Sequence, residues 1–351
     1  MTKLVIAAIG PASSVQDGGR PGSQRYGLVP SGAMDRLALA AANTLVGNEP
    51  FAAAIEVGPF GAKFTAHGGA VRVALAGASR NADIAGRPVA LDTSATLADG
   101  ETLTLGFARG GSFSYLAIEG GIAGEPMFGS LAVNARAGLG SPYPRPLQAG
   151  DELQATAASG APERRIELPA AGDAAIRVLW GPQDDEFADE TRKLFLDSEW
   201  KISATSDRMG YRLEGPALRH LHGHNIVSDG TVDGSLQVPG NGQPIVLMRD
   251  RGTSGGYPKI ATVISADFGR FAQVPAGRGF RFRAVSMAEA QAEARKFAEL
   301  LRALPERLRA IESVDLNIDA LHDANVAGHA VSAVDAGTWH GVTQADVAGP
   351  D

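Results

Sequence analysis

Residues 234–277 read GSLQVPGNGQPIVLMRDRGTSGGYPKIATVISADFGRFAQVPAG. Within this stretch, short apolar runs such as 245–248 alternate with the turn-forming residues glycine, proline, asparagine and aspartate. Gly255-Gly256 and Pro258 fall where a chain would turn between two strands. The pattern predicts short β-strands joined by tight turns.

The same alternation continues outside this stretch. Glycine contributes 44 and proline 20 of the 351 residues, and many of the glycines occur in pairs. Apolar or β-branched runs recur at 71–76, 102–105, 113–118 and 176–180, and phenylalanine alternates with arginine at 280–283. We therefore predict a mainly β protein.

Two segments carry helical signals instead. Residues 31–35 introduce apolar residues at helical spacing, and Gly47 closes the pattern. Near the C-terminus, Ser286 and Glu289 form a capping box, after which apolar residues recur at helical spacing until Pro305. We predict few helices, including one near the C-terminus.

Composition excludes several classes of site and partner. The chain has no cysteine, which excludes disulfides, cysteine-ligated zinc and a thiol nucleophile. Its formal charge of −7 comes from interspersed acids and bases, so we expect no nucleic-acid partner. No segment has the roughly 20 apolar residues of a membrane span, and the N-terminus lacks a signal-peptide pattern. We expect a cytoplasmic protein with no membrane partner.

A weak internal echo suggests a tandem organisation. Gly120-Gly121 precedes the turn 147–151, and Gly255-Gly256 precedes the similar turn 274–278. A segment rich in alanine, glycine, proline and charge, 155–172, has the composition of a linker. The predicted parts are a first half at 1–168, a second half at 169–290, and a C-terminal helix and tail at 291–351.

The sequence supports neither a serine nucleophile, nor a histidine metal site, nor a phosphate-binding P-loop. Gly252 to Gly256 fit the pattern of a serine nucleophile elbow, but Pro258 disfavours the helix that must follow it. His220, His222 and His224 would share one face of a strand, yet no acidic cluster accompanies them, so no metal site is predicted. The chain also lacks a phosphate-binding P-loop.

Many polar residues remain in turn contexts, where they either cap β-turns or line a ligand site. They lie in the segments 16–22, 31–35, 206–211, 237–239 and 250–259, together with Asn43 and Asn48.

These segments resemble a known family. SVQDGGRPGSQRYGLVPSGAMDRLALAAANTLVGN at 14–48, SDRMGYRLEGP at 206–216 and the stretch 234–277 are similar to signature stretches of the biotin-dependent carboxyltransferase, allophanate hydrolase subunit 2 or KipA-like family. The family includes the C subunit of the ATP-dependent 5-oxoprolinase and the carboxyltransferase region of urea amidolyase. The resemblance covers about residues 5–290, and the tail at 306–351 has no recognised counterpart.

The resemblance implies tandem cyclophilin-like β-barrels around a cleft. It also implies a partner, the cyclophilin-like B subunit, and in 5-oxoprolinase the A subunit too, with ATP used by the assembled enzyme to open a lactam. We expect the C subunit of a 5-oxoprolinase-type hydrolase acting on a small amide or ureido substrate. The alternatives are a carboxyltransferase that uses carboxybiotin and a urea-like acceptor, and a KipA-like regulatory protein without turnover.

Together with the family resemblance, the chemistry of these residue types suggests roles for them. Lys259 is the preferred cation for an oxygen that gains charge, and Asp35 and Asp250 are candidate proton acceptors or orienting groups. Arg20 and Arg208 either clamp an anion or brace turns by pairing with the neighbouring Asp17 and Asp207. The predicted substrate-binding residues are Gln16, Arg20, Asn43, Arg208, Gln237, Thr253, Gly255, Gly256 and Tyr257.

The turn at 250–259 departs from the usual family pattern D-R-Q-T-T-G-G-Y at two positions. Gly252 and Ser254 stand where glutamine and threonine are common, whereas Asp250, Thr253 and Lys259 are present. We therefore expect a retained site whose substrate can differ.

Overall fold

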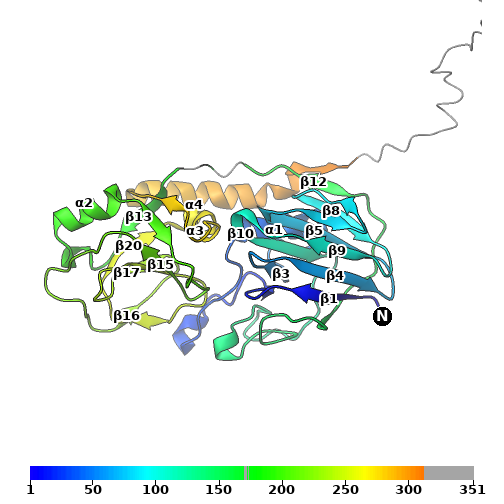
Figure 1. Cartoon of the computed structure of the whole chain (residues 1–351), viewed down its shortest axis with the longest axis horizontal. Helices are drawn as coiled ribbons and strands as arrows, with labels where there is room; N and C mark the ends of the chain where they lie inside the picture. Colours follow the sequence, from blue (N-terminus) through cyan, green and yellow to red (C-terminus); the bar gives the residue numbers. More distant parts are fainter. Residues whose placement is uncertain (170–171, 173, 312–351) are drawn as a thin grey trace, which may run out of the picture. The chain divides into compact units, whose positions relative to one another are not determined.

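The computed structural model describes residues 1–169, 172 and 174–311. Strands dominate it, and they form three larger sheets and a two-stranded ribbon (Figure 1). The predicted mainly β fold of tandem barrel-like units with few helices is confirmed.

The first β unit consists of two sheets. The six-stranded sheet has the order β11-β1-β4-β9-β6-β7. Its strands are β1 (Lys3–Ile9), β4 (Ala62–His67), β6 (Ala82–Ile84), β7 (Arg87–Pro88), β9 (Thr102–Leu105) and β11 (Glu152–Gln154). Buried and exposed residues alternate along β4, as expected for a strand with one face in the core.

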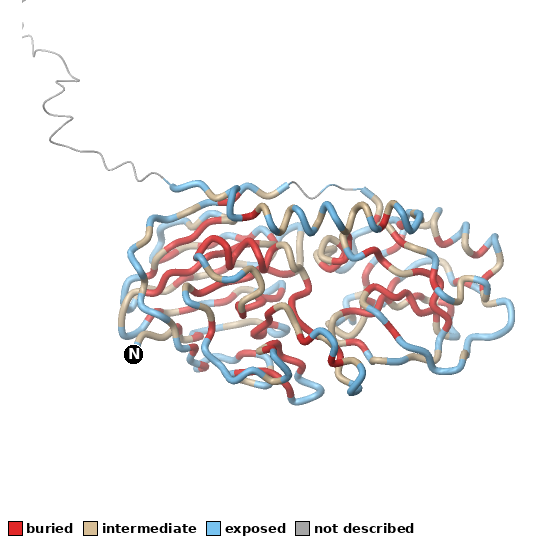
Figure 2. The backbone as a smooth tube through the Cα atoms, turned by 180° about the vertical axis from the view of Figure 1, so that it is seen from behind, coloured by how far each residue is buried: buried red, intermediate tan, exposed pale blue. Residues whose placement is uncertain are grey.

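The seven-stranded sheet has the order β2-β3-β10-β5-β8-β12-β23. Its strands are β2 (Ser14–Gln16), β3 (Ala54–Val57), β5 (Val71–Ser79), β8 (Thr93–Leu97), β10 (Arg109–Ile118), β12 (Arg164–Ile166) and β23 (Leu308–Ala310). One face packs on the six-stranded sheet, where Leu4, Phe64, Leu75 and Leu116 share a core. Because helix α1 (Arg36–Leu45) covers β5 and β10 on the other face, these strands are buried on both sides (Figure 2).

The second β unit is one eight-stranded sheet with the order β21-β14-β15-β18-β17-β20-β13-β22. Its strands are β13 (Ile176–Trp180), β14 (Trp200–Ile202), β15 (Gly210–Glu214), β17 (Ser235–Gln237), β18 (Ile245–Leu247), β20 (Lys259–Val263), β21 (Gly279–Phe280) and β22 (Phe282–Ala284). Only Arg281 separates β21 from β22, which form opposite edges of the sheet, so the sheet curls into a nearly closed barrel.

Two predicted helices are confirmed. Asp35 caps α1 by accepting hydrogen bonds from two backbone N–H groups. Ser286 Oγ caps α4 (Met287–Arg302) by accepting from Glu289 N at 3.2 Å. Helices α2 (Asp189–Asp197) and α3 (Ser265–Ala272) were not predicted, and the described residues also form four short 3₁₀ turns. They are η1 (Ser23–Tyr26), η2 (Ala135–Ala137), η3 (Asp184–Glu186) and η4 (Leu304–Arg307).

Two local predictions need correction. The proposed linker 155–172 contains β12, which pairs with β8 and with β23, so part of it belongs to a sheet. The segment that carries His220, His222 and His224 is not a strand in the structure, so their alternation does not place them on one strand face. His220 Nε2 lies 2.9 Å from Val238 O, and the described residues contain no cluster of three or more potential metal ligands. The tail at 312–351 lies outside the described residues. Within the described part of the chain, no helix is long and apolar enough to cross a membrane.

Candidate active site

Lys259 begins β20 and is almost completely buried. The residues that follow it, Ile260 and Ala261, anchor the strand in the core of the second β unit. The Lys259 side chain is only 2% exposed, and its Nζ lies 3.2 Å from Asp229 Oδ2. Apart from this ion pair, Nζ has no hydrogen-bond partner among the described residues. A buried ammonium with unused donors is unusual and requires an explanation.

Gln237 lies beside Lys259 on the neighbouring strand. Residues Gln237 and Lys259 are register partners between β17 and β20, at a point where the register shifts. The Gln237 side chain is buried, and its Nε2 also has no partner within the described structure. Two neighbouring strands therefore present one cationic donor, whose partner in the described residues is the Asp229 carboxylate, and one neutral N–H donor that has no partner among them.

Gly255 passes directly over the Gln237 amide. A Cβ atom added to Gly255 would lie 2.0 Å from Gln237 Nε2, which no side chain can do without displacing the amide. The glycine is thus required for close approach of the backbone. At Gly256 the nearest atom would be 3.6 Å away, so the constraint is specific to Gly255.

A segment that we call the strap, residues 226–231, holds this turn in place. Strand β16 (Asp229–Gly230) of the strap pairs with β19 (Ser254–Gly255) in the two-stranded ribbon. At its ends, Ile226 N donates to Gly256 O at 2.9 Å and Thr231 N donates to Thr253 O at 3.1 Å. Tyr257, by contrast, is exposed.

The strap carries Asp229 to the Lys259 ammonium. Gln183 supports this contact, because its Nε2 donates to Asp229 Oδ2 at 3.3 Å while its Oε1 accepts from Lys259 N at 3.2 Å. The Lys259 ammonium, followed by the N–H groups of Gly230 and Gln183, holds the pKa of Asp229 below its ordinary value. Asp229 and Gln183 were missed by the sequence analysis, although Asp229-Gly230 has the composition of a turn.

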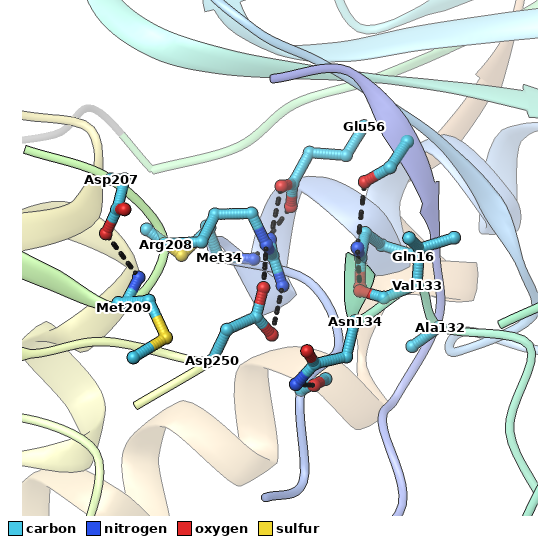
Figure 3. A network of polar contacts seen from close by, with 12 residues as sticks. Gln16, Met34, Glu56, Ala132, Val133, Asn134, Asp207, Arg208, Met209 and Asp250 are labelled. Atoms are coloured by element: carbon cyan, nitrogen blue, oxygen red, sulfur yellow. Dashed lines mark hydrogen bonds and ion pairs between the residues drawn. The ribbon is translucent and has the colours of Figure 1, made fainter. Parts of the chain in front are cut away.

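Arg208, whose side chain is 13% exposed, forms a brace between the two β units instead of pairing with Asp207. Its guanidinium donates to Glu56 Oε1 and to Asp250 Oδ2, the latter at 2.8 Å (Figure 3). It also donates to Gly32 O at 2.8 Å. Burial disfavours the charge of Arg208, but Asp250 and Glu56 outweigh this effect and keep its pKa above its ordinary value. Arg208 and Asp250 therefore satisfy each other.

Glu56 extends the brace into the first β unit. Its Oε2 accepts from Tyr115 OH at 2.7 Å and from Met34 N at 2.9 Å. Burial, together with the nearby charges of Glu56 and Asp35, raises the pKa of Tyr115 well above its ordinary value. Glu56 was not among the predicted site residues.

Asp35 and Asn43 are occupied by local structure. Besides capping α1, Asp35 accepts from Gln273 Nε2 at 3.0 Å, which links α1 to α3. The Asn43 amide donates to Ala52 O at 2.8 Å, and its Oδ1 accepts from Asn48. The structure does not bring Asn43 to Lys259 as a free recognition group.

Gln16 and Arg20 are buried in the first β unit, and each retains one unused polar atom. Gln16 Nε2 donates to Val133 O at 3.0 Å, whereas Gln16 Oε1 has no partner in the described residues. Arg20 donates to Ala132 O, and its Nη1 is likewise unpaired among them. Burial lowers the pKa of Arg20, while Asp17 and Asp250 act in the opposite direction. Asp17 accepts from Gly19 N, Ser130 Oγ and Leu131 N instead of pairing with Arg20.

A separate cavity lies elsewhere in the described structure. It has a volume of about 920 Å³ and is lined by α3 and α4, with Asp35, Arg177, Asp267 and Glu293 in its wall. These charges are already paired, since Arg177 lies 2.6 Å from Asp267 and 2.9 Å from Glu293. The buried donors Lys259 Nζ and Gln237 Nε2, which have no hydrogen-bond partner among the described residues, do not line this cavity.

Comparison with known proteins agrees with the resemblance of the signature stretches. Residues 26–284 match the model of the carboxyltransferase domain, subdomain A and B. The chain belongs to this carboxyltransferase-domain family. Its match begins within η1 and ends with β22, so it includes Lys259, Gln237, Asp229 and the Arg208 brace.

Two relatives in this family match the chain over most of their length. The 5-oxoprolinase C subunit of Escherichia coli (strain K12) is 38% identical over 295 residues, which cover 82% of this chain and 93% of the relative. The 5-oxoprolinase C subunit of Haemophilus influenzae is 37% identical over 285 residues, covering 81% and 92%.

Solved structures of larger proteins also match. TTHA0988 is similar with a TM-score of 0.73 and 32% identity, and the match covers 81% of this chain but 56% of TTHA0988. The urea amidolyase of K. lactis is similar with a TM-score of 0.77 and 26% identity, covering 85% of this chain and 20% of that enzyme. The chain thus spans about half of one solved chain and a fifth of the other.

Proposed function

We propose that this chain is the C subunit of an ATP-dependent 5-oxoprolinase-type amidohydrolase, which hydrolyses 5-oxo-L-proline to L-glutamate and couples this step to the hydrolysis of ATP to ADP and phosphate. The support is the match to the two C-subunit relatives over 93% and 92% of their lengths. The cyclophilin-like B subunit and the A subunit of such an enzyme are the proposed partners, and the cytoplasm is the proposed location. Since the chain lacks a P-loop, we assign ATP to the assembled enzyme and route no step of this chain through it.

The pair of unused donors, Lys259 Nζ and Gln237 Nε2, carries the proposal. When the lactam opens, an oxygen nucleophile adds to the carbonyl carbon and negative charge develops on the carbonyl oxygen. As the C=O bond re-forms, the C–N bond breaks and the ring nitrogen keeps the electron pair and takes a proton. Fixed donors in a buried site stabilise such charge more effectively than water does. Lys259 and Gln237 would donate to this oxygen, and Gly255 leaves room for the Gln237 amide.

The other predicted residues support this pair in different ways. Thr253, Gly255, Gly256 and Tyr257 shape the turn that faces the strap. We propose that Arg208 and Asp250 position this turn against the first β unit, and that Asp35 positions α1. Gln16 and Arg20 remain substrate-binding candidates because each has an unused buried atom, whereas Asn43 has none.

The test is reconstitution. The chain is co-expressed with its two partner subunits, and the assembly receives 5-oxo-L-proline and ATP. Release of glutamate is the expected result. A folded assembly that releases none would contradict the proposal.

Carboxyl transfer from carboxybiotin to a urea-like acceptor is the second candidate. The family model is that of a carboxyltransferase domain, and the K. lactis urea amidolyase has a similar fold. The same two donors can hold the charged oxygen of a carboxyl group in transit. Carboxylation of urea by the chain supplied with carboxybiotin would favour this candidate.

The third candidate is a KipA-like regulator, which would bind its partner and would not turn over a substrate. In that case Lys259→Ala would leave binding to the cyclophilin-like partner and any regulatory effect unchanged, and no preparation would turn over substrate. Titration calorimetry of wild type and Lys259→Ala with this partner, run beside the glutamate assay, separates this case from the enzyme.

A further inference from the structure

We infer that Asp229 is a resident counter-ion, which occupies at Lys259 the position that the reacting oxygen of the substrate must take. The inference rests on the proposed function and assigns a positioning role to a residue outside the predicted site. Asp229 would cover the Lys259 ammonium in the ligand-free protein and be displaced when substrate binds.

The geometry of the ion pair supports this role. Lys259 is 2% exposed while Asp229 is 53% exposed, so a ligand from solvent meets the carboxylate before the ammonium. Asp229 Oδ2, at 3.2 Å from Nζ, is the only ion-pair partner that the described residues offer to Lys259. An oxygen atom of the protein therefore stands where an anionic oxygen of the substrate is needed.

The strap allows the carboxylate to leave without unfolding the site. The strap is held to the 252–256 turn by backbone pairing and by Thr231 Oγ1, which donates to Gly252 O at 2.6 Å. None of these contacts uses the Asp229 side chain. Within the described structure, Oδ1 accepts only from the adjacent Gly230 N, at 2.7 Å, and Oδ2 accepts from Gln183 Nε2 at 3.3 Å. A side-chain rotation toward solvent that breaks these two hydrogen bonds uncovers Nζ.

As a consequence, the Asp229 carboxylate and a substrate oxygen would compete for the Lys259 ammonium. An ion pair with one exposed partner is weak, so a substrate oxygen can displace it. A neutral carbonyl oxygen competes poorly with a carboxylate, whereas an oxygen carrying developing charge competes well. Asp229 would thus weaken binding of the ground state more than binding of the transition state.

Asp229→Asn tests the inference, with Asp185→Asn as the matched control. Asp185 lies in η3 near Gln183, is exposed, and forms no ion pair with Lys259 in the described structure. Both changes remove one negative charge, but only Asp229→Asn removes the counter-ion. Two measurements are made on the full-length chain: the rate of Lys259 acetylation by acetic anhydride, followed by mass spectrometry, and the affinity for 5-oxo-L-proline by calorimetry.

We expect Asp229→Asn to raise the acetylation rate of Lys259 severalfold and to bind 5-oxo-L-proline about fivefold more tightly, the scale set by a half-exposed ion pair. Asp185→Asn should match wild type in both. Unchanged acetylation in Asp229→Asn would overturn the inference, and so would unchanged or weaker binding by a variant that binds at all. If no variant binds 5-oxo-L-proline while acetylation rises only in Asp229→Asn, the counter-ion stands and the proposed substrate fails.

Discussion

At the scale of single residues, the candidate site is formed by contacts between residues far apart in the sequence. The sequence alone predicted some of these residues and missed others. Lys259, Gln237 and Gly255 were selected from the sequence, and the structure brings these three together. Asp229 was missed because its partner is 30 positions away and only the pairing of β16 with β19 brings the strap to the turn. Asn43 was selected because its amide could recognise a substrate. In the structure this amide instead donates to Ala52 O, in the loop that follows α1.

Gly255→Ala should damage the site without unfolding the protein. The added Cβ would have to push the Gln237 amide from its position, because the two atoms would otherwise lie 2.0 Å apart. We expect turnover to fall roughly tenfold or more, with a loss of about 1–3 kcal/mol in stability. Gly230→Ala is the control, because a Cβ at Gly230 meets open space. Equal turnover of the two variants in the glutamate assay would show that Gln237 is not needed.

Asp92 predicts a pH-dependent stability that is unrelated to the site. Burial raises its pKa from 3.8 to about 6, against a hydrogen bond from Gly77 and with a smaller contribution from Asp35. Because the folded state binds this proton more tightly than the unfolded chain, Asp92 lowers stability above about pH 6, and the penalty fades as the pH falls toward 4.

Asp92→Asn should therefore raise the free energy of unfolding by up to about 3 kcal/mol near pH 8, with a smaller gain near pH 5. Urea denaturation at the two pH values measures the difference. A gain that is the same at both would mean that the carboxylate is not the cause.

At the scale of elements, local patterns succeeded where a strand or helix is defined by its own residues. Strands β9 and β13 match the predicted runs 102–105 and 176–180, and the capping box at Ser286 starts α4. Helix α2 was missed because it is short, and only Thr191 and Phe195 of it are buried. Strand β23 was missed because its pairing with β12 spans more than 140 positions, a contact no local pattern encodes.

Asp35→Asn tests whether Asp35 serves helix α1 or the chemistry. Asparagine is also a good helix cap, so α1 should keep its N-cap and the stability should change by less than about 1 kcal/mol. We expect turnover to stay within about tenfold of wild type, because the carboxylate is occupied by Leu37 N, Ala38 N and Gln273. A loss of a hundredfold or more in a folded variant would instead assign Asp35 as a proton acceptor.

At the scale of the whole described structure, an ion-paired group of side chains joins the two β units. The sequence analysis considered the members of this group one by one and did not predict their pairing. Arg208 and Asp250 were both predicted as site residues, but the structure pairs Arg208 with Asp250 and also with Glu56. The sequence could indicate the tandem arrangement of two β units and the resemblance to the family. It could not show which acid would meet which base, since these residues are 42 and 152 positions apart.

Arg208→Met should destabilise the protein strongly, by about 3–5 kcal/mol, because it leaves the Glu56 and Asp250 carboxylates without their buried counter-ion. The exposed Arg212→Met is the control, and we expect it to change stability by less than about 1 kcal/mol. Urea denaturation of both variants provides the comparison. A similar small effect in both would mean that the brace contributes little.

The central claim is that the buried Lys259 ammonium stabilises charge on the substrate, and turnover of Lys259→Met in the assembled enzyme tests it most directly. The loss of one such donor should raise the activation barrier by about 3 kcal/mol, which lowers the rate roughly a hundredfold. The exposed Lys201→Met is the control and should keep wild-type turnover. We predict that Lys259→Met folds, binds its cyclophilin-like partner and releases glutamate about a hundredfold more slowly than wild type. Near-normal glutamate release by Lys259→Met would contradict the account.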